Sequence, residues 1–497
     1  MEKSACVILL FVLSGARYSL QLDCADMKGF NQVQQWNEDF VVEWIEAMIA
    51  CGNDMDSNQI IQLVVQQGFL KVVKILLESG ADVNATEANS GKTVLMVAVI
   101  HGYKDIAALL IEKGANINAF DKDGRTALIY MAMYGRKEIA DLLIANGANI
   151  NAFDKDGYTA LMYAANFGKK EIADLLLGTE DVDVNAKNHK GTALVLAVHG
   201  GHTSVATSLL KDPSTDVDAK DWHNRTALIH ATGTGNEEIT NLLIAKGANV
   251  NVMDERGDTA LILAVIAGSN GAATSLLKDH SIDVDAKAED GLTALMHAAK
   301  TGNEEIAGLL IAKGANINLV DEIGDTALIY AAQVGAKEIV DLLLDADDDV
   351  DVNAKNYNGD TALIVAVKKG NNGAATSLLE FLPIDDDVKD KDGLTPLMHA
   401  AKTGNQEIAD LIIDFGEADI NATDDSGTTT LMYAVDNGSV DIASLLIEEG
   451  ADISAKDVDG DTALMIAASL GYGQLSNILL DNGTDIDAQN GNGETAL

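Results

Sequence analysis

The chain has 497 residues, of which 47% are hydrophobic, and this apolar content excludes an intrinsically disordered protein. Its 77 acidic and 34 basic residues give a formal net charge of −43. The negative electrostatic field of such a chain repels nucleic acid, and binding to phosphate needs clustered lysine and arginine. A nucleic-acid-binding protein is therefore excluded.

The first predicted element is an apolar run from Ala5 to Leu13, followed by small residues at positions 14–16. The run has the length of the hydrophobic part of a signal peptide and is too short to span a bilayer. We therefore predict a signal peptide at residues 1–16 and a secreted or exported protein. A cytoplasmic protein that begins with an apolar strand or helix is the alternative. No other segment approaches membrane length, so we expect no membrane insertion.

Residues 17–52 are predicted to be an N-terminal capping segment with one helix. Apolar residues recur there at helical spacing, namely Phe40, Val41, Trp44, Ile45, Met48 and Ile49. Such a helix would cover the open apolar end of a stack of repeats, as terminal elements of stacked proteins must. A dimer contact or a partner-docking helix is the alternative.

A repeat begins after this segment. Thr-x-Leu recurs every 33 to 35 residues, with its Thr at positions 93, 126, 159, 192, 226, 259, 293, 326, 361, 395, 429, 462 and 495. We predict thirteen repeats over residues 53–488 and the truncated start of a fourteenth at 489–497.

The repeat at residues 121–152 shows how short-range sequence signals predict two helices. An Asp-x-Asp-Gly turn precedes Thr126, which is placed to cap a short helix that Gly135 ends. A second helix is predicted over Lys137–Ala145. Helices this short are marginal alone in water, so each pair must bury its apolar side against the pairs before and after it.

These residues resemble the ankyrin-repeat family, and the form closest to the family motif is Thr395-Pro396-Leu397-Met398. The resemblance implies an all-α solenoid of stacked helix-turn-helix units with β-turn or hairpin loops. The histidine position of the family motif holds Ile, Met or Val here, so the histidine that bonds across neighbouring repeats is absent. Stability is therefore expected to depend more on apolar stacking.

The resemblance also implies a non-enzymatic scaffold that binds a partner protein through the repeat turn tips and the inner face of the first helices. The candidate protein-binding residues occupy the variable positions near the turn glycine and near the end of the first helix. They are Lys122, Asp123, Met133, Tyr134, Asp156, Tyr158, Asn166, Phe167, Glu255, Arg256, Gln333 and Val334. Tyr134, Tyr158 and Phe167 are the best candidates for interface hot spots, as exposed aromatic residues. Packing under neighbouring turns is the alternative for these three.

The charge of −43 favours a partner with a basic patch, which the field would attract. The alternative is that the charge only keeps a long protein soluble. Two other functions are compatible with the repeats. The chain would be either the targeting module of a secreted effector or toxin whose catalytic part is absent from it, or a structural spacer.

No motif for catalysis or for a cofactor stands out. Gly91-Lys92-Thr93 resembles the end of a phosphate loop, but position 86 holds Thr instead of the leading glycine. The Asp-rich turns lack the residue order of a calcium loop, and His199 and His202 have no acidic or thiol neighbours at ligand spacing. We therefore predict no catalytic residue, no cofactor and no metal.

Overall fold

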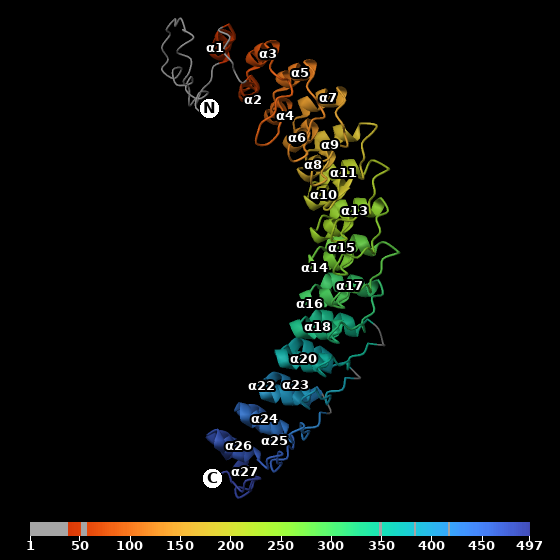
Figure 1. Ribbon diagram of the computed structural model, residues 1–497. Helices are drawn as coiled ribbons and strands as arrows, with labels where there is room; N and C mark the ends of the chain where they lie inside the picture. The colour runs from red at the N-terminus through yellow and green to blue at the C-terminus, as the bar shows by residue number, and fades with distance from the viewer. Residues whose placement is uncertain (1–37, 51–56, 347–349, 382–383, 416–417) are drawn as a thin grey trace. The chain divides into compact units, whose positions relative to one another are not determined.

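The computed structural model describes residues 38–50, 57–346, 350–381, 384–415 and 418–497 (Figure 1). The predicted signal peptide at 1–16 lies outside these residues. The chain divides into two compact units, one of Met1–His230 with Ala245–Gly247, and the other of Ala231–Ile244 with Ala248–Leu497. We call them unit 1 and unit 2. No helix of the described residues is long and apolar enough to cross a membrane.

Unit 1 consists of helix pairs and one short hairpin. Its elements are α1 (Glu38–Ala50), α2 (Ser57–Gln67), α3 (Leu70–Glu78), α4 (Val94–His101), α5 (Lys104–Glu112), α6 (Ala127–Tyr134), α7 (Lys137–Ala145), α8 (Ala160–Asn166), α9 (Lys170–Leu177), β1 (Lys187–Asn188), β2 (Gly191–Thr192), α10 (Ala193–His199) and α11 (Thr203–Leu209). Figure 1 shows α4, α6, α8 and α10 following one another along one side, with α5, α7, α9 and α11 along the other.

The next two helices, α12 (Ala227–Gly233) and α13 (Glu237–Ala245), each contain residues of both units. Unit 2 continues the same pattern. Its helices are α14 (Ala260–Ile266), α15 (Asn270–Leu277), α16 (Ala294–Thr301), α17 (Glu304–Ala312), α18 (Ala327–Val334), α19 (Lys337–Leu344), α20 (Ala362–Lys369), α21 (Asn372–Leu379), α22 (Pro396–Thr403), α23 (Gln406–Phe415), α24 (Thr430–Asn437), α25 (Val440–Glu448), α26 (Ala463–Ser469) and α27 (Gly473–Asp481).

The prediction of an all-α repeat protein built from stacked helix pairs is confirmed within each unit. In unit 2, α16 packs on α18 and α18 on α20, while α17 packs on α19 and α19 on α21. The core lies between successive pairs, where residues such as Leu128, Leu161 and Leu295 are almost fully buried. Hairpin loops are present too, since β1 pairs with β2 and a bridge joins Phe153 to Thr159.

The repeat threonines begin the first helices, as predicted. Thr126 Oγ1 accepts a hydrogen bond from the backbone N–H of Ile129 at 3.3 Å, which satisfies one of the free amides of α6. Gly135 ends α6 with a φ of 70°, a conformation that costs glycine nothing and other residues much more. Thr192 is an exception, because its Oγ1 is buried and makes no capping bond.

Replacing Thr159 by alanine is expected to lower the free energy of unfolding by about 0.5–2 kcal/mol. Its Oγ1 accepts from the Met162 amide at 3.2 Å, and the substitution leaves that buried donor unsatisfied. Urea unfolding followed by circular dichroism measures the loss. Thr192→Ala is the matched control, since Thr192 makes no such bond, and a loss as large as that of Thr159→Ala would contradict the capping role.

At the N-terminal end of the described residues, α1, which belongs to the predicted capping segment, packs on α3 of the first predicted repeat. Val41 and Ile45 are buried, and the Glu38 carboxylate accepts from the Lys71 amide at 2.7 Å. Ile49 is partly exposed, at 38%. The side chains of Phe40, Trp44 and Met48, which were part of the same prediction, lie outside the described residues.

Candidate binding surface

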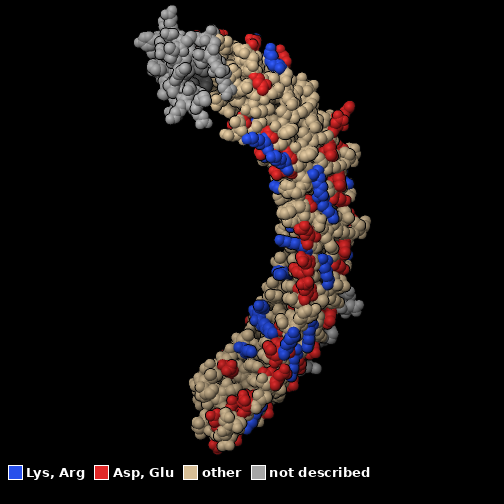
Figure 2. Space-filling model, in the orientation of Figure 1, with Lys and Arg blue, Asp and Glu red and all other residues tan. Residues whose placement is uncertain are grey.

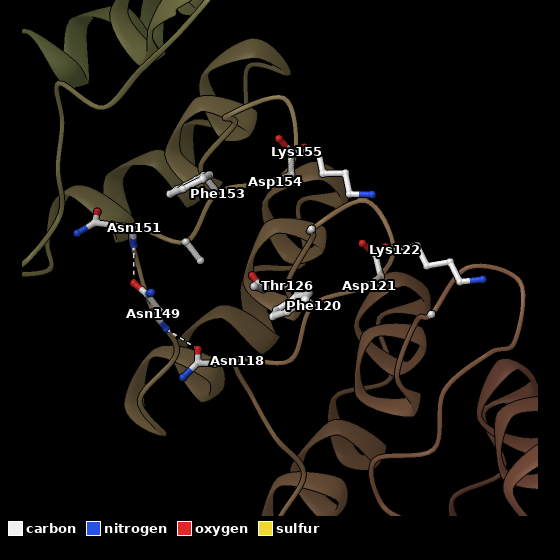
Figure 3. A pocket seen from close by; sticks show the side chains of 13 residues that line it. Asn118, Phe120, Asp121, Lys122, Thr126, Asn149, Asn151, Phe153, Asp154 and Lys155 are labelled. Carbon is white, nitrogen blue, oxygen red and sulfur yellow. Dashed lines mark hydrogen bonds between the residues drawn. The ribbon is translucent and has the colours of Figure 1, made fainter.

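Successive turns are held in register by asparagine side chains. Asn118 Oδ1 accepts from the backbone N–H of Asn149 in the next repeat at 2.7 Å, and Asn151 Oδ1 accepts from the Asp183 amide at 2.8 Å. The side-chain amide of Asn118 also donates to the Gly147 carbonyl, at 3.1 Å. Figure 3 shows part of this ladder, with Asn118, Asn149 and Asn151 in a row. The ladder fixes the spacing of the side chains that neighbouring turns expose to solvent.

In several turns an aspartate links the turn to the first helix. Asp154 Oδ1 accepts from the amides of Asp156 and Tyr158, while its Oδ2 accepts from the Tyr163 hydroxyl at 2.6 Å. Burial, strengthened by the bond to Asp154, raises the pKa of Tyr163 to about 12, so the hydroxyl keeps its proton and donates. The equivalent pairs elsewhere are Asp121–Tyr130, Asp221–His230, Asp321–Tyr330, Asp390–His399 and Asp424–Tyr433.

These pairs are absent from the expectations drawn from the sequence. Stability was expected to depend more on apolar stacking because the family's histidine is absent, but in these repeats the turn aspartate also bonds to the first helix. A pattern in the sequence accompanies these bonds. Wherever the pair forms, an aspartate stands nine residues before a tyrosine or histidine, as in Asp121 and Tyr130.

A second set of contacts joins adjacent first helices. The residue seven after one repeat threonine meets the residue four after the next, so Lys300 Nζ lies 5.3 Å from the Tyr330 ring centroid. Lys402 lies over the Tyr433 ring at the same distance. The same positions also bring His199 to His230. These contacts therefore join the ends of adjacent first helices within each unit.

The structure exposes most of the predicted binding residues. Lys122, Asp123, Tyr134, Asp156, Phe167, Glu255, Arg256, Gln333 and Val334 are exposed, and Met133 and Asn166 are half-buried. Tyr134 and Phe167 are 48% and 45% exposed and stack on the rings of Tyr130 and Tyr163 beneath them.

The expectation that Tyr158 is an exposed aromatic residue is wrong. Its side chain is buried because the ring packs 5.0 Å from the Tyr163 ring and edge-on to His189 of the next turn. The alternative, packing under a neighbouring turn, describes its position. Tyr158 therefore supports the turn and is not a free contact residue.

Two aromatic residues that are more exposed than Tyr134 and Phe167 were not predicted. Phe120 and Phe153 stand directly before the turn aspartate in neighbouring repeats and are 74% and 69% exposed. They line an open hollow of about 960 Å³ in unit 1, together with Asn118, Asn149 and Asn151. Figure 3 shows both phenylalanines on the side of the asparagine row, while Lys122 and Lys155 extend the other way.

A comparison of repeats would have found this pair. Most other repeats carry lysine at the same position, as Lys287, Lys355, Lys389 and Lys456 do. There the ammonium group donates to a backbone carbonyl of the next repeat; for Lys287 this is the Val320 carbonyl, at 2.7 Å. Phenylalanine cannot make this bond, so its exposure has no such structural role.

Other exposed apolar residues sit at turn tips elsewhere. Trp222 in unit 1 is 64% exposed, and Ile323, Tyr357 and Val458 in unit 2 are similarly open to solvent. Single exposed apolar residues are ordinary on protein surfaces. Phe120 and Phe153 differ from these single residues, because two aromatic side chains of neighbouring repeats line one hollow.

Comparison with known proteins gives one result. A family model described as ankyrin repeats (3 copies) matches residues 34–121, 119–188, 180–254, 235–321, 309–386 and 372–457, and the model of the single ankyrin repeat matches residues 459–491. No curated protein matches the chain.

Proposed function

From the premise that this chain belongs to the ankyrin-repeat family, whose repeats are generally modules of protein–protein interaction, we propose that it is a non-enzymatic scaffold that binds a partner protein. The binding surface consists of the turn tips and the exposed inner ends of the first helices. Because residues 1–16 have the pattern of a signal peptide, we also propose that the protein is secreted or exported.

The observation that carries the proposal is the hollow beside Phe120 and Phe153. Exposed aromatic side chains contribute most to interface energy when a partner covers them. The asparagine ladder holds the two repeats in register, so the rings are preorganised and little conformational entropy is lost on binding. Tyr134 and Phe167 are exposed at the ends of the first helices in the same two repeats and add aromatic side chains for a partner to cover.

The charge supports a partner with a basic patch. Figure 2 shows acidic side chains spread over the visible face of both units, with basic ones between them, and the chain as a whole carries −43. Long-range attraction of this kind accelerates encounter more than it slows dissociation. Solubility alone is the competing role for the charge.

The experiment captures partners on the full chain at physiological salt, identifies them by mass spectrometry, and measures their kinetics. We expect Phe120→Ala with Phe153→Ala to increase the off-rate of the specific partner by at least about tenfold, since a hot-spot residue contributes about 2 kcal/mol or more. Tyr134→Ala and Phe167→Ala are expected to increase it less. Phe415→Ala, an exposed aromatic residue at the end of the second helix α23 in unit 2 and not at a turn tip, is the control and should leave the off-rate unchanged.

The same partner tests the role of charge. If the acidic surface attracts the partner, the on-rate falls as salt rises to the physiological range, where charges more than about 8 Å apart are largely screened. An on-rate that does not change with salt concentration would mean that the charge contributes to solubility only. Partners that dissociate at the same rate from all the aromatic variants would contradict the proposed binding surface.

A further inference from the structure

Two histidines from neighbouring repeats of unit 1 meet at the inner end of the first helices. His199 is the last residue of α10, and His230 lies in α12, 31 residues later. Their Nδ1 atoms are 3.3 Å apart, and the rings stand edge to face with centroids 4.9 Å apart. His199 is exposed to solvent, whereas the His230 side chain is only 11% exposed. The pair therefore opens to solvent on one side and is anchored on the other.

Asp221 determines which nitrogen of His230 carries the proton. Its Oδ2 lies 2.9 Å from His230 Nε2, and its Oδ1 accepts from the backbone amides of His223 and Arg225, both at 2.9 Å. A carboxylate only accepts, so the His230 Nε2 is the donor. With its proton on Nε2, the neutral ring presents the lone pair of Nδ1 in the direction of His199.

The spacing of the two Nδ1 atoms matches that of a pair of metal ligands. Two imidazole nitrogens, each about 2.0–2.1 Å from a tetrahedral ion, lie about 3.3–3.4 Å apart. Without an ion, His199 donates its Nδ1 proton to His230. When that proton moves to the exposed Nε2 of His199, two lone pairs converge between the rings. A histidine ligand usually donates its other N–H to a carboxylate, as His230 does to Asp221.

We propose that His199 and His230 form a binding site for a divalent transition-metal ion such as Zn²⁺, with Asp221 orienting His230. Neutral imidazole suits this class of ion, whereas Ca²⁺ and Mg²⁺ prefer oxygen ligands. The described residues contain no group of three His, Cys, Asp or Glu side chains that could hold a metal, so water completes the coordination. The site goes beyond the proposed protein binding, although it lies on the same inner face of the repeats.

The sequence alone predicts no metal, because the histidine nearest to His199 along the chain is His202. The ligand that the structure brings to His199 comes from the next repeat. His202 instead contacts the Asn166 carbonyl through its Nε2 at 3.1 Å.

Unit 2 contains a matched site that should not bind. His399 is held by Asp390 at 2.8 Å as His230 is held by Asp221, but the residue equivalent to His199 is Lys368. The Lys368 ammonium group donates to Asp390 Oδ2 at 2.9 Å and has no lone pair to offer an ion. The two sites thus differ in the one side chain that the proposal needs.

The experiment titrates ZnCl₂ into the chelator-treated full chain at neutral pH and follows binding by calorimetry. We expect His199→Asn or His230→Asn to weaken the tightest Zn²⁺ site at least about tenfold, and Asp221→Asn to weaken it by about 10–100-fold. His399→Asn should leave it unchanged. His199→Lys copies the arrangement at Lys368, so it removes the ligand while keeping a side chain that this position accepts elsewhere in the chain.

Thermal unfolding monitors the fold of each variant, and only variants that unfold at the wild-type temperature are compared. Zn²⁺ binding that is unchanged in both His199→Asn and His199→Lys would overturn the proposal. An equal loss in His399→Asn would do so too, because it would show general binding by surface histidines and carboxylates. Neither result would affect the proposed protein binding, which is tested on other residues.

Discussion

Replacing Leu161 by alanine is expected to lower the free energy of unfolding by about 2–5 kcal/mol. Leu161 lies at the start of α8, is 2% exposed, and belongs to the layer in which α8 packs between α6 and α10. Alanine removes the buried methyl groups and leaves a cavity that closely packed neighbours cannot fill. Urea unfolding of the full chain, followed by circular dichroism, measures the loss.

Two comparisons decide what the result means. Val458→Ala, at a position 73% exposed, is expected to change stability by no more than about 0.5 kcal/mol. The loss from Leu161→Ala should also exceed that from Thr159→Ala, because a core cavity costs more than one capping bond. The reverse order would mean that the register assigned to this repeat is incorrect.

Replacing Asp390 by alanine is expected to cost about 2–5 kcal/mol, since it leaves the buried N–H groups of His399 and Leu394 without their acceptor. The buried Asp390 carboxylate accepts from Lys368 Nζ at 2.9 Å, from His399 Nε2 at 2.8 Å and from the amide of Leu394 at 3.0 Å. Alanine leaves these donors without that acceptor. Asp392→Ala, at an exposed position of the same turn, is the control and should cost far less.

The same carboxylate makes stability depend on pH. Burial raises the pKa of Asp390, but the hydrogen bonds from Lys368, Leu394 and His399 outweigh it and lower the pKa to about 2. The folded pKa is below the unfolded value of about 3.9, so this contribution is present above about pH 4 and is lost as the pH falls toward 2. The difference in unfolding free energy between wild type and Asp390→Asn should therefore shrink over that range. A difference that stays constant with pH would contradict the assigned bonds.

The sequence by itself determined the helix pairs of this protein, because the signals that begin and end them are local. Thr126 and Gly135 enclose α6 as their positions predicted, since an N-cap bond and a positive φ depend only on residues within a few positions. The spacing of Thr-x-Leu then implied a stack, because helices of this length cannot bury their apolar side alone. Leu161, the leucine of one Thr-x-Leu motif, is buried in this stack.

Only the tertiary structure decided which side chains of different repeats meet. Tyr158 is buried because His189 of the next turn lies against its ring, and Phe120 and Phe153 border one hollow because their repeats are adjacent. His199 meets His230 for the same reason. Each of these contacts joins residues about one repeat apart, so it depends on how far one helix pair is shifted and rotated on the next. That geometry results from the packing of whole side chains, which the periodicity of a sequence does not specify.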